Sequence, residues 1–299
     1  MVVNKVLRSN LFAIITVFCW GTSYIISKTL LQSMTAFQLI WLRFIAAYIT
    51  MWILHPKWHF NLKEEGLFLV IAIFSNTLYF ICENSALKYT QSSNVSILAS
   101  TIPLITAFLL FVFKGRKIRG LELLGCIIAF LGVILVVFNG VFYLKLSPKG
   151  DLLAIGAALS WSVYSLMMTD RIRQYNNFLV TRKLMFYGII TMTPIVGFTG
   201  GFGNITAGLT GGNIIRILYL AVVCSALCYL MWNTAMRDLG VMTLNIYLYA
   251  MPVITLAAGA IVLGEKITFM GTAGMIIVIA GMILSSLVTE KKEKRKKQK

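Results

Sequence analysis

Acidic residues are scarce in this sequence. Of 299 residues only ten are Asp or Glu, against 27 Lys or Arg, and charged residues make up 12% of the chain. Charged residues make up about a quarter of a typical water-soluble protein. The mean hydropathy of +0.84 and the hydrophobic content of 59% therefore exclude a soluble protein and predict a polytopic membrane protein.

Histidine and cysteine are also scarce. The two histidines, His55 and His59, have no Cys or carboxylate at metal-ligand spacing, and the five cysteines lie inside apolar runs without a CxxC motif. The sequence therefore predicts no metal site, no cofactor and no disulfide framework. The motifs HExxH, GxSxG and a phosphate-binding GK[ST] loop do not occur either, so we expect neither an enzyme nor an ATP-driven pump.

Long apolar runs fill most of the chain. A helix needs about 20 apolar residues to cross ~30 Å of hydrocarbon, and the runs lack the alternation of strands in a membrane barrel. The sequence predicts an all-α polytopic membrane protein with ten transmembrane helices. The expected spans are 10–30, 34–54, 66–87, 92–113, 119–139, 151–169, 179–199, 213–236, 241–263 and 268–289.

The Lys and Arg residues are distributed unevenly between the two sides of these spans. Placing both termini in the cytoplasm puts 20 basic residues inside and six outside, with Arg43 left within a span. Because cytoplasmic flanks retain positive charge, this predicts a plasma (inner) membrane protein with both termini cytoplasmic. Seven basic residues lie in the tail, 291–299, which is most simply interpreted as a topological anchor in contact with anionic lipids of the bilayer, and not as a site for a nucleic-acid partner.

The chain contains an internal repeat. Residues 84–135 align with 233–284 without a gap, and 15 of the 52 pairs are identical. At a slightly shorter spacing, Trp20 of the first span corresponds to Trp161 of the sixth. Because each repeat has five helices, the second must enter the membrane from the opposite side, and inverted repeats are typical of carriers that work by alternating access. The expected units are a first repeat over 1–145, an inverted second repeat over 146–290 and a basic cytoplasmic tail over 291–299.

Four stretches carry a family resemblance: ENSALKYTQSSNVSILASTIPLITAFLLFVFKGRKI, its repeat WNTAMRDLGVMTLNIYLYAMPVITLAAGAIVLGEKI, WLRFIAAY and WGTSYIISK. Together they are similar to the drug/metabolite transporter superfamily, EamA type. The resemblance covers essentially the whole chain and implies a ten-helix carrier of the inner membrane that exports amino acids or other small metabolites. One departure is Gly115-Arg116, where the family has Gly-Glu, a pair found here only as Gly264-Glu265.

Glu83 is the one carboxylate expected well inside a span. Asn76, Tyr79 and Glu83 follow an i, i+3, i+7 pattern and so share one helical face. Polar groups inside a membrane face a cavity or one another, which makes Glu83 a candidate for proton coupling or for neutralising a cationic substrate. The structural alternative is a hydrated Glu83 at the interface, or one paired with Lys88. The repeat equivalents of this face are Ser225, Cys228 and Trp232.

Aromatic residues occupy the middle of the first and sixth spans, although Trp ordinarily favours the membrane interface. We interpret them as cavity walls, with ordinary helix packing as the alternative, and expect the cavity between spans 1, 3, 4, 6, 8 and 9. Polar pairs four residues apart in the fourth and ninth spans complete the set. The expected substrate-binding residues are Trp20, Tyr24, Asn76, Tyr79, Glu83, Ser96, Ser100, Trp161, Tyr164, Cys228, Trp232, Asn245 and Tyr249.

Arg43 and two prolines are the remaining candidates. Arg43 lies near the middle of the second span, where its fork of donors suits an anion or a carboxylate, or else a structural contact with helix carbonyls. Pro103 and Pro252 occupy equivalent positions of the two repeats. Each removes a backbone hydrogen bond and predicts a kink, with a hinge as the alternative.

The expected function is secondary transport of a small molecule, with export of amino acids or related metabolites as the first hypothesis. Organic or quaternary cations, held by Glu83 and aromatic rings, are the alternative substrate class. A lipid scramblase or a non-transporting membrane protein is the alternative from a different class. The sequence leaves the choice between monomer and homodimer open.

Overall fold

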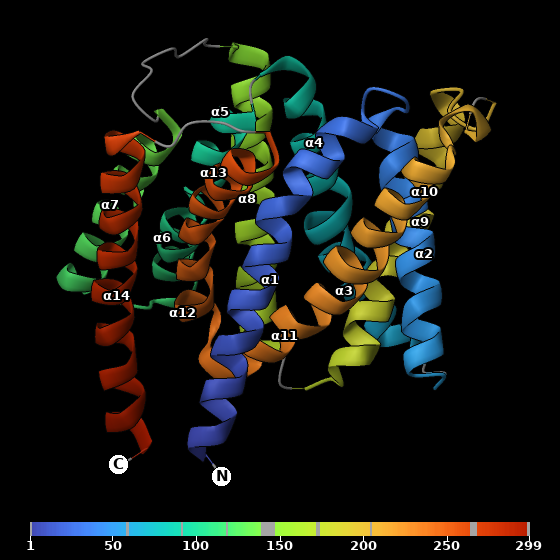
Figure 1. Ribbon diagram of the computed structural model, residues 1–299. Helices are drawn as coiled ribbons and strands as arrows, with labels where there is room; N and C mark the ends of the chain where they lie inside the picture. The colour runs from blue at the N-terminus through green and yellow to red at the C-terminus, as the bar shows by residue number, and fades with distance from the viewer. Residues whose placement is uncertain are drawn as a thin grey trace.

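The protein is described by a computed structural model that covers residues 2–57, 60–90, 92–117, 119–138, 147–171, 174–203, 205–263 and 268–297. In these residues the chain forms one bundle of helices (Figure 1). Nine of the described helical segments are long and apolar enough to cross a membrane, and a tenth, shorter apolar helix covers Phe269–Ser285. They follow the ten predicted spans in order, so the prediction of an all-helical, ten-span protein is confirmed.

Each repeat contributes five helical segments. The first comprises α1 (Val2–Leu30), α2 (Ala36–Leu54), α3 (Leu62–Ala72) with α4 (Tyr79–Tyr89), α5 (Ser92–Ala99) with α6 (Ile102–Lys114), and α7 (Gly120–Phe138). The second comprises α8 (Pro148–Arg171), α9 (Asn177–Phe198), α10 (Gly211–Leu218) with α11 (Cys228–Leu239), α12 (Val241–Ile246) with α13 (Ala250–Leu263), and α14 (Phe269–Lys297).

Polar side chains at the helix starts define where several spans begin. The first N–H groups of a helix have no partner within it, and a Ser, Thr, Asp or Asn just before the helix supplies one. Thr35 does this for α2 in a reciprocal cap, in which Gln38 N donates to Thr35 Oγ1 and Thr35 N donates to Gln38 Oε1. Asn61, Asn176 and Thr210 each accept one backbone N–H at the start of α3, α9 and α10.

The two repeats interrupt their helices at equivalent places. A π-helical segment, Ile73–Leu78, joins α3 to α4, and another, Tyr219–Leu227, joins α10 to α11. The fourth span breaks between α5 and α6, and the ninth passes through a 3-10 turn between α12 and α13. Pro103 and Pro252 lie in the first turn of α6 and of α13, where the missing N–H leaves no bond unmade.

Glycines bring α7 and α14 into close contact at one edge of the bundle (Figure 1). A Cβ on Gly125 would lie 2.6 Å from the amide nitrogen of Ser285, and a Cβ on Gly281 would lie 2.4 Å from that of Ala129. No side chain fits between the two helices at these positions. This small-residue packing, typical of membrane helices, ties the last span of the first repeat to the last span of the second.

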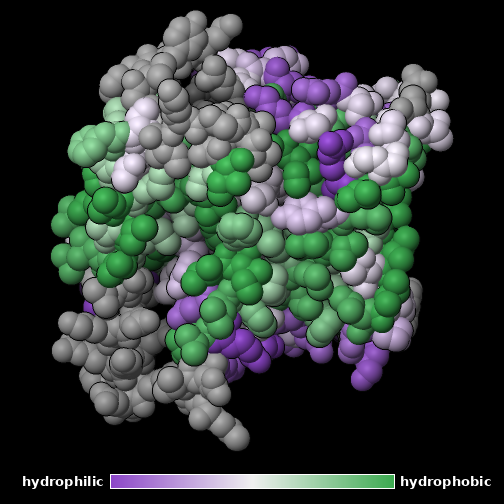
Figure 2. Space-filling view, viewed as in Figure 1, coloured by the Kyte–Doolittle hydropathy of each residue, from purple (hydrophilic) through white to green (hydrophobic). Residues whose placement is uncertain are grey.

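The two repeats run through the bundle in opposite directions. The start of α1 and the end of α14 lie at one end of the bundle (Figure 1), which we call the termini end; the other is the distal end. The second repeat starts at the distal end, where Lys149 at the start of α8 lies against Tyr89 at the end of α4. On the face drawn in Figure 2, hydrophobic residues form a belt between two hydrophilic edges, as expected of a multi-pass membrane protein.

Candidate functional site

A cavity lies between the two repeats, in the distal half of the bundle. Its lining residues come from the distal part of α1, from the first half of α4, from the second half of α5 through the start of α6, and from α2, α8, α11 and the ninth span. The cavity therefore includes the expected spans 1, 3, 4, 6, 8 and 9, together with the second span. The predicted residues that line it are Trp20, Tyr24, Arg43, Tyr79, Glu83, Ser96, Ser100 and Trp161.

One acidic and one basic side chain, those of Glu83 and Arg43, line this cavity. Glu83 accepts a hydrogen bond from Tyr79 Oη at 2.7 Å. The buried Arg43 donates from Nε to Ser225 Oγ, and its guanidinium carbon lies 4.5 Å from the centre of the Phe80 ring. Among the described residues neither Glu83 nor Arg43 forms an ion pair within 4.0 Å. The alternative of a Glu83–Lys88 pair is thus not formed among the described residues.

Three buried polar atoms of the cavity lack a hydrogen-bond partner within the described part of the chain. They are Tyr24 Oη, Ser96 Oγ and Trp161 Nε1, and all three residues are more than nine-tenths buried. Buried polar groups in folded proteins are nearly always hydrogen-bonded. These three atoms are therefore candidates to contact a bound molecule.

A cluster of aromatic rings borders the cavity, and Trp20, Trp161 and Tyr229 of this cluster belong to its lining. The ring centres of Trp20 and Trp161 are 5.3 Å apart, and Trp232 lies 4.9 Å from Trp20. Tyr229 contacts both Trp20 and Trp161. The indole of Trp20 is held by a hydrogen bond from Nε1 to the carbonyl oxygen of Cys224 at 2.9 Å. We call Trp20, Trp161, Trp232 and Tyr229 the aromatic floor.

Asn76 points away from the cavity, because the helix around it is not α-helical. It lies in the π-helical segment, whose i→i+5 bonding adds a residue to the turn and rotates the next turn of the helix about its axis. Its Nδ2 donates to the carbonyl oxygen of Leu184 in α9 at 2.8 Å. Tyr79 and Glu83 come after this segment and reach the cavity, together with Phe80.

The other predicted residues lie outside the cavity lining, in the packed interior. Cys228 is buried against α1, where Thr16 Oγ1 bonds to its carbonyl oxygen. Tyr164 donates to Asn233 Oδ1 at 2.6 Å, and Tyr249 is fully buried in an apolar cluster with α7. Trp232 belongs to the aromatic floor. Asn245 donates from Nδ2 to Thr106 Oγ1 at 2.9 Å and to Ser165 Oγ at 3.3 Å.

Sequence reasoning missed several lining residues. Phe80 and Tyr229 line the cavity at equivalent positions of the two repeats, and Leu248 and Met251 line it beside the break in the ninth span. The repeat alignment pairs Phe80 with Tyr229, and this aromatic pair was the available signal. Phe80 lies three residues before Glu83 in α4 and so shares its helical face, a spacing that the pattern through Asn76, Tyr79 and Glu83 did not use.

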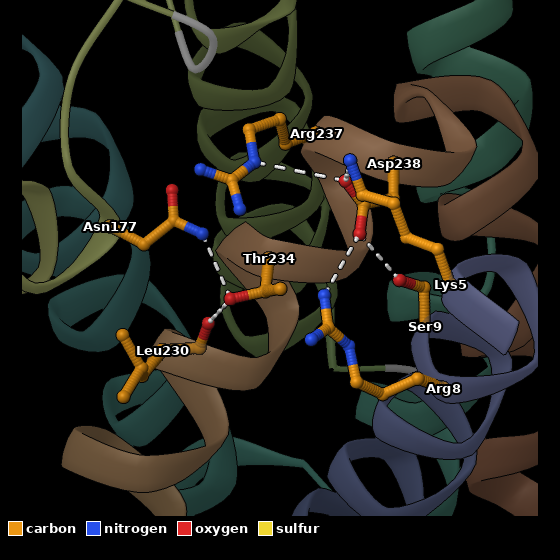
Figure 3. Close-up of polar contacts among 8 residues, drawn as sticks. All are labelled: Lys5, Arg8, Ser9, Asn177, Leu230, Thr234, Arg237 and Asp238. Atoms are coloured by element: carbon orange, nitrogen blue, oxygen red, sulfur yellow. Dashed lines mark hydrogen bonds and ion pairs between the residues drawn. The ribbon is translucent and has the colours of Figure 1, made fainter. Parts of the chain in front are cut away.

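Ion pairs join α1 to α11 at the termini end (Figure 3). The Asp238 carboxylate, whose side chain is 2% exposed, lies 3.2 Å from Lys5 Nζ, 3.6 Å from Arg8 Nη2 and 3.7 Å from Arg237 Nε. Ser9 Oγ donates to the same carboxylate at 2.8 Å. We call these five residues the Asp238 cluster.

The departure from the family pattern is accommodated within the first repeat. Arg116 Nη2 lies 2.8 Å from Glu122 Oε1 at the start of α7, so the Arg that replaces the expected Glu forms its own ion pair. The corresponding Gly264-Glu265 of the second repeat lies outside the described residues.

Comparison with known proteins identifies the family and the fold of this chain. Residues 7–138 and 148–287 match the EamA-like transporter family. An uncharacterized transporter of Archaeoglobus fulgidus is 28% identical over 93% of this chain and 97% of its own length. A probable amino-acid metabolite efflux pump of Salmonella typhimurium is 25% identical over 93% of this chain and 94% of its own. A protein of known crystal structure has the same fold, with a TM-score of 0.75 at 16% identity over 95% of this chain and 98% of that one.

Proposed function

Because the chain belongs to the EamA-like transporter family, we propose that it is a secondary carrier that exports amino acids or related small zwitterions by alternating access. The observation that carries the proposal is the cavity between inverted repeats, with Arg43 and Glu83 both in its lining. The membrane is the plasma (inner) membrane, and the termini end faces the cytoplasm, in keeping with the excess of Lys and Arg at that end.

The two charges suit the two ends of a zwitterion. The Arg43 guanidinium offers a fork of N–H donors to a carboxylate, and Glu83 offers acceptors to an ammonium group. Tyr24 Oη, Ser96 Oγ and Trp161 Nε1 supply further polar contacts. The aromatic floor provides an apolar surface for the rest of the substrate. The name of the Salmonella relative, an amino-acid metabolite efflux pump, supports the same class.

Arg43 disfavours the alternative of an organic cation. A quaternary ammonium ion beside Glu83 and the aromatic rings gains cation–π attraction. The same cavity, however, presents the positive charge of Arg43, which no described carboxylate pairs with. A molecule that brings its own carboxylate removes this repulsion, whereas a plain cation does not.

Flux into proteoliposomes tests the proposal. Radiolabelled amino acids, polyamines and choline-like cations are offered to the wild type and to Glu83→Gln and Arg43→Gln, with and without a proton gradient. Each variant loses one charged hydrogen-bonding partner, worth roughly 1.5–3 kcal/mol, so amino-acid flux falls about tenfold to a hundredfold. Glu122→Gln is the matched control, because it makes the same change in a buried carboxylate outside the cavity.

Other outcomes identify the rival functions. If choline-like cations move, and only Glu83→Gln stops them, the carrier is one for organic cations. If no solute moves while a fluorescent lipid exchanges between leaflets, the protein is a scramblase. If a proton gradient accelerates flux in the wild type but not in Glu83→Gln, Glu83 couples transport to protons.

A further inference from the structure

A second cavity lies at the termini end, apart from the first. It has a volume of about 110 Å³ and lies where α2 ends and α3 and α9 begin. Its walls are the aromatic rings of Tyr48, Trp52, Phe60, Phe186 and Tyr187. Phe60 is 59% exposed at the mouth, whereas the charged residues of the cavity are buried behind it.

The charged residues of this cavity, Glu65, Arg182 and Lys183, carry a net charge of one positive unit. Lys183 Nζ lies 2.5 Å from Glu65 Oε1, and Tyr187 Oη donates to Glu65 Oε2 at 2.5 Å, so Lys183 and Glu65 neutralise each other. Arg182 donates to the backbone carbonyl oxygens of His55 and Lys57 at the end of α2. No carboxylate among the described residues pairs with Arg182.

Arg182 keeps donors for a ligand. A guanidinium has five N–H groups, and two of them bond to the carbonyls of His55 and Lys57, just after α2. Its carbon lies 4.2 Å from the centre of the Trp52 ring, which orients the plane of the fork. Lys183 Nζ, with one bond to Glu65, has two further N–H donors. The cavity thus combines a net positive charge with several free donors.

Exposed apolar residues lie beside the cavity on the surface of the bundle. Ile49 and Ile53 follow the same side of α2 at a spacing of four, beside Tyr48 and Trp52, and both are exposed; Ile190 is exposed on α9, one turn after Phe186. Aromatic and basic side chains at helix ends mark the level where hydrocarbon meets the headgroups. A ligand of this cavity therefore arrives from the membrane, with an anionic group for Arg182 and an apolar part for the isoleucines.

We infer that this cavity binds the phosphate of an anionic phospholipid headgroup, with the acyl chains lying along Ile49, Ile53 and Ile190. A phosphate matches the fork of Arg182 in geometry and in charge. A choline headgroup brings a second positive charge beside Arg182 and loses part of that attraction. Basic cavities between helix ends on the cytoplasmic side are typical sites for anionic lipids, and the proposed orientation places the termini end on that side.

Native mass spectrometry of the full-length protein with added phosphatidylglycerol or phosphatidylcholine tests the site. The wild type is expected to retain phosphatidylglycerol in preference to phosphatidylcholine. Arg182→Gln removes the unpaired charge and reduces this preference about fivefold, the equivalent of one basic residue at an anionic membrane surface. Phe60→Glu, at an exposed loop position that leaves the helices intact, puts a negative charge at the mouth and has the same effect.

Arg216→Gln is the matched control, because it removes one positive charge from an exposed residue at the distal end. It is expected to leave the lipid preference unchanged. Equal retention of the two lipids by the wild type overturns the inference, as does a preference that all three variants share. If millimolar inorganic phosphate alone raises the melting temperature as much as phosphatidylglycerol does, the ligand is a free anion and the lipid assignment is wrong.

Discussion

The termini half and the distal half of the bundle use repeat-equivalent residues in different ways. In the termini half, Asn245 of α12 donates to Ser165 Oγ of α8 at 3.3 Å and to Thr106 Oγ1 of α6 at 2.9 Å. At the spacings that relate the two repeats, Asn245 corresponds to Ser96 and Ser165 to Tyr24. Tyr24 Oη and Ser96 Oγ line the cavity and have no partner within the described residues. The Asn245–Ser165 pair thus bonds α12 to α8, whereas the corresponding Ser96–Tyr24 pair makes no hydrogen bond between α5 and α1.

We attribute this difference to conformation, as the proposed alternating access requires. The repeats share their span order, their π-helical segments and their breaks before proline, so each half has the parts to adopt the arrangement of the other. In the proposed cycle, the Asn245–Ser165 contact breaks as a Tyr24–Ser96 contact forms, and the cavity opens at the termini end. These two pairs are then the contacts that alternate.

Another repeat-related contact is present in both halves. The Asp238 cluster joins α1 to α11 at the termini end (Figure 3). Its counterpart at the distal end joins α8 to α4, where Lys149 Nζ lies 4.3 Å from the centre of the Tyr89 ring. Because helices are joined at both ends in the same state, we expect these contacts to persist through the cycle and the helix pairs to move as units.

The largest effect on the balance between the halves is expected from Asn245→Ala. The substitution removes two buried hydrogen bonds that join α12 to α8 and α6, worth about 2 kcal/mol in total, so the population open at the termini end rises roughly thirtyfold. Hydrogen–deuterium exchange of α12 and of the end of α8 should increase, while that of α5 should fall. Unchanged exchange in both halves would show that this contact does not hold the termini half closed.

A smaller, opposite effect is expected from Tyr24→Phe. The hydroxyl has no hydrogen-bond partner among the described residues, so the described arrangement loses no bond, whereas the proposed distal closure loses one of about 1 kcal/mol. Transport should slow about fivefold while the melting temperature stays the same. Tyr249→Phe is the control, since it removes another such buried hydroxyl that lies outside the cavity. Equal slowing in both variants would contradict the assignment of Tyr24.

The smallest effect on this balance is expected from Asp238→Asn. It breaks ion pairs with three partly exposed cations and lowers the free energy of unfolding by about 1–2 kcal/mol. Because the contact is present in both halves, the exchange difference between α12 and α5 should not change. If exchange rises in the termini half alone, the Asp238 cluster is part of the alternating closure.

The sequence predicted the spans well and the site in part. Ten spans could be read from the apolar runs because the bilayer requires a minimum apolar length for each helix. Glu83, Trp20 and Trp161 were expected in a cavity and line it. Asn76 was expected beside them but bonds to α9 instead, because a π-helical turn, which leaves no clear trace in residue type, rotates the face.

Arg43 shows a second limit of the sequence. Its position within a span was visible, but a place in the cavity could not be separated from a structural contact. In the structure Arg43 has both roles. It donates a structural hydrogen bond to Ser225, and it lies beside Phe80 in the cavity lining. Its partners come from other spans, and residue spacing within one span carries no information about them.

The sequence by itself determined that this chain is a helical membrane protein with two inverted repeats, because hydrocarbon thickness, unpaired backbone groups and the distribution of basic residues act on each span alone. The tertiary structure alone decided which polar atoms meet. The pairing of Asn245 with Ser165, and the separation of Tyr24 from Ser96, depend on helix rotation and on distances between spans. Those quantities come from the packing of all ten spans together, so the open cavity is a property of the assembled bundle.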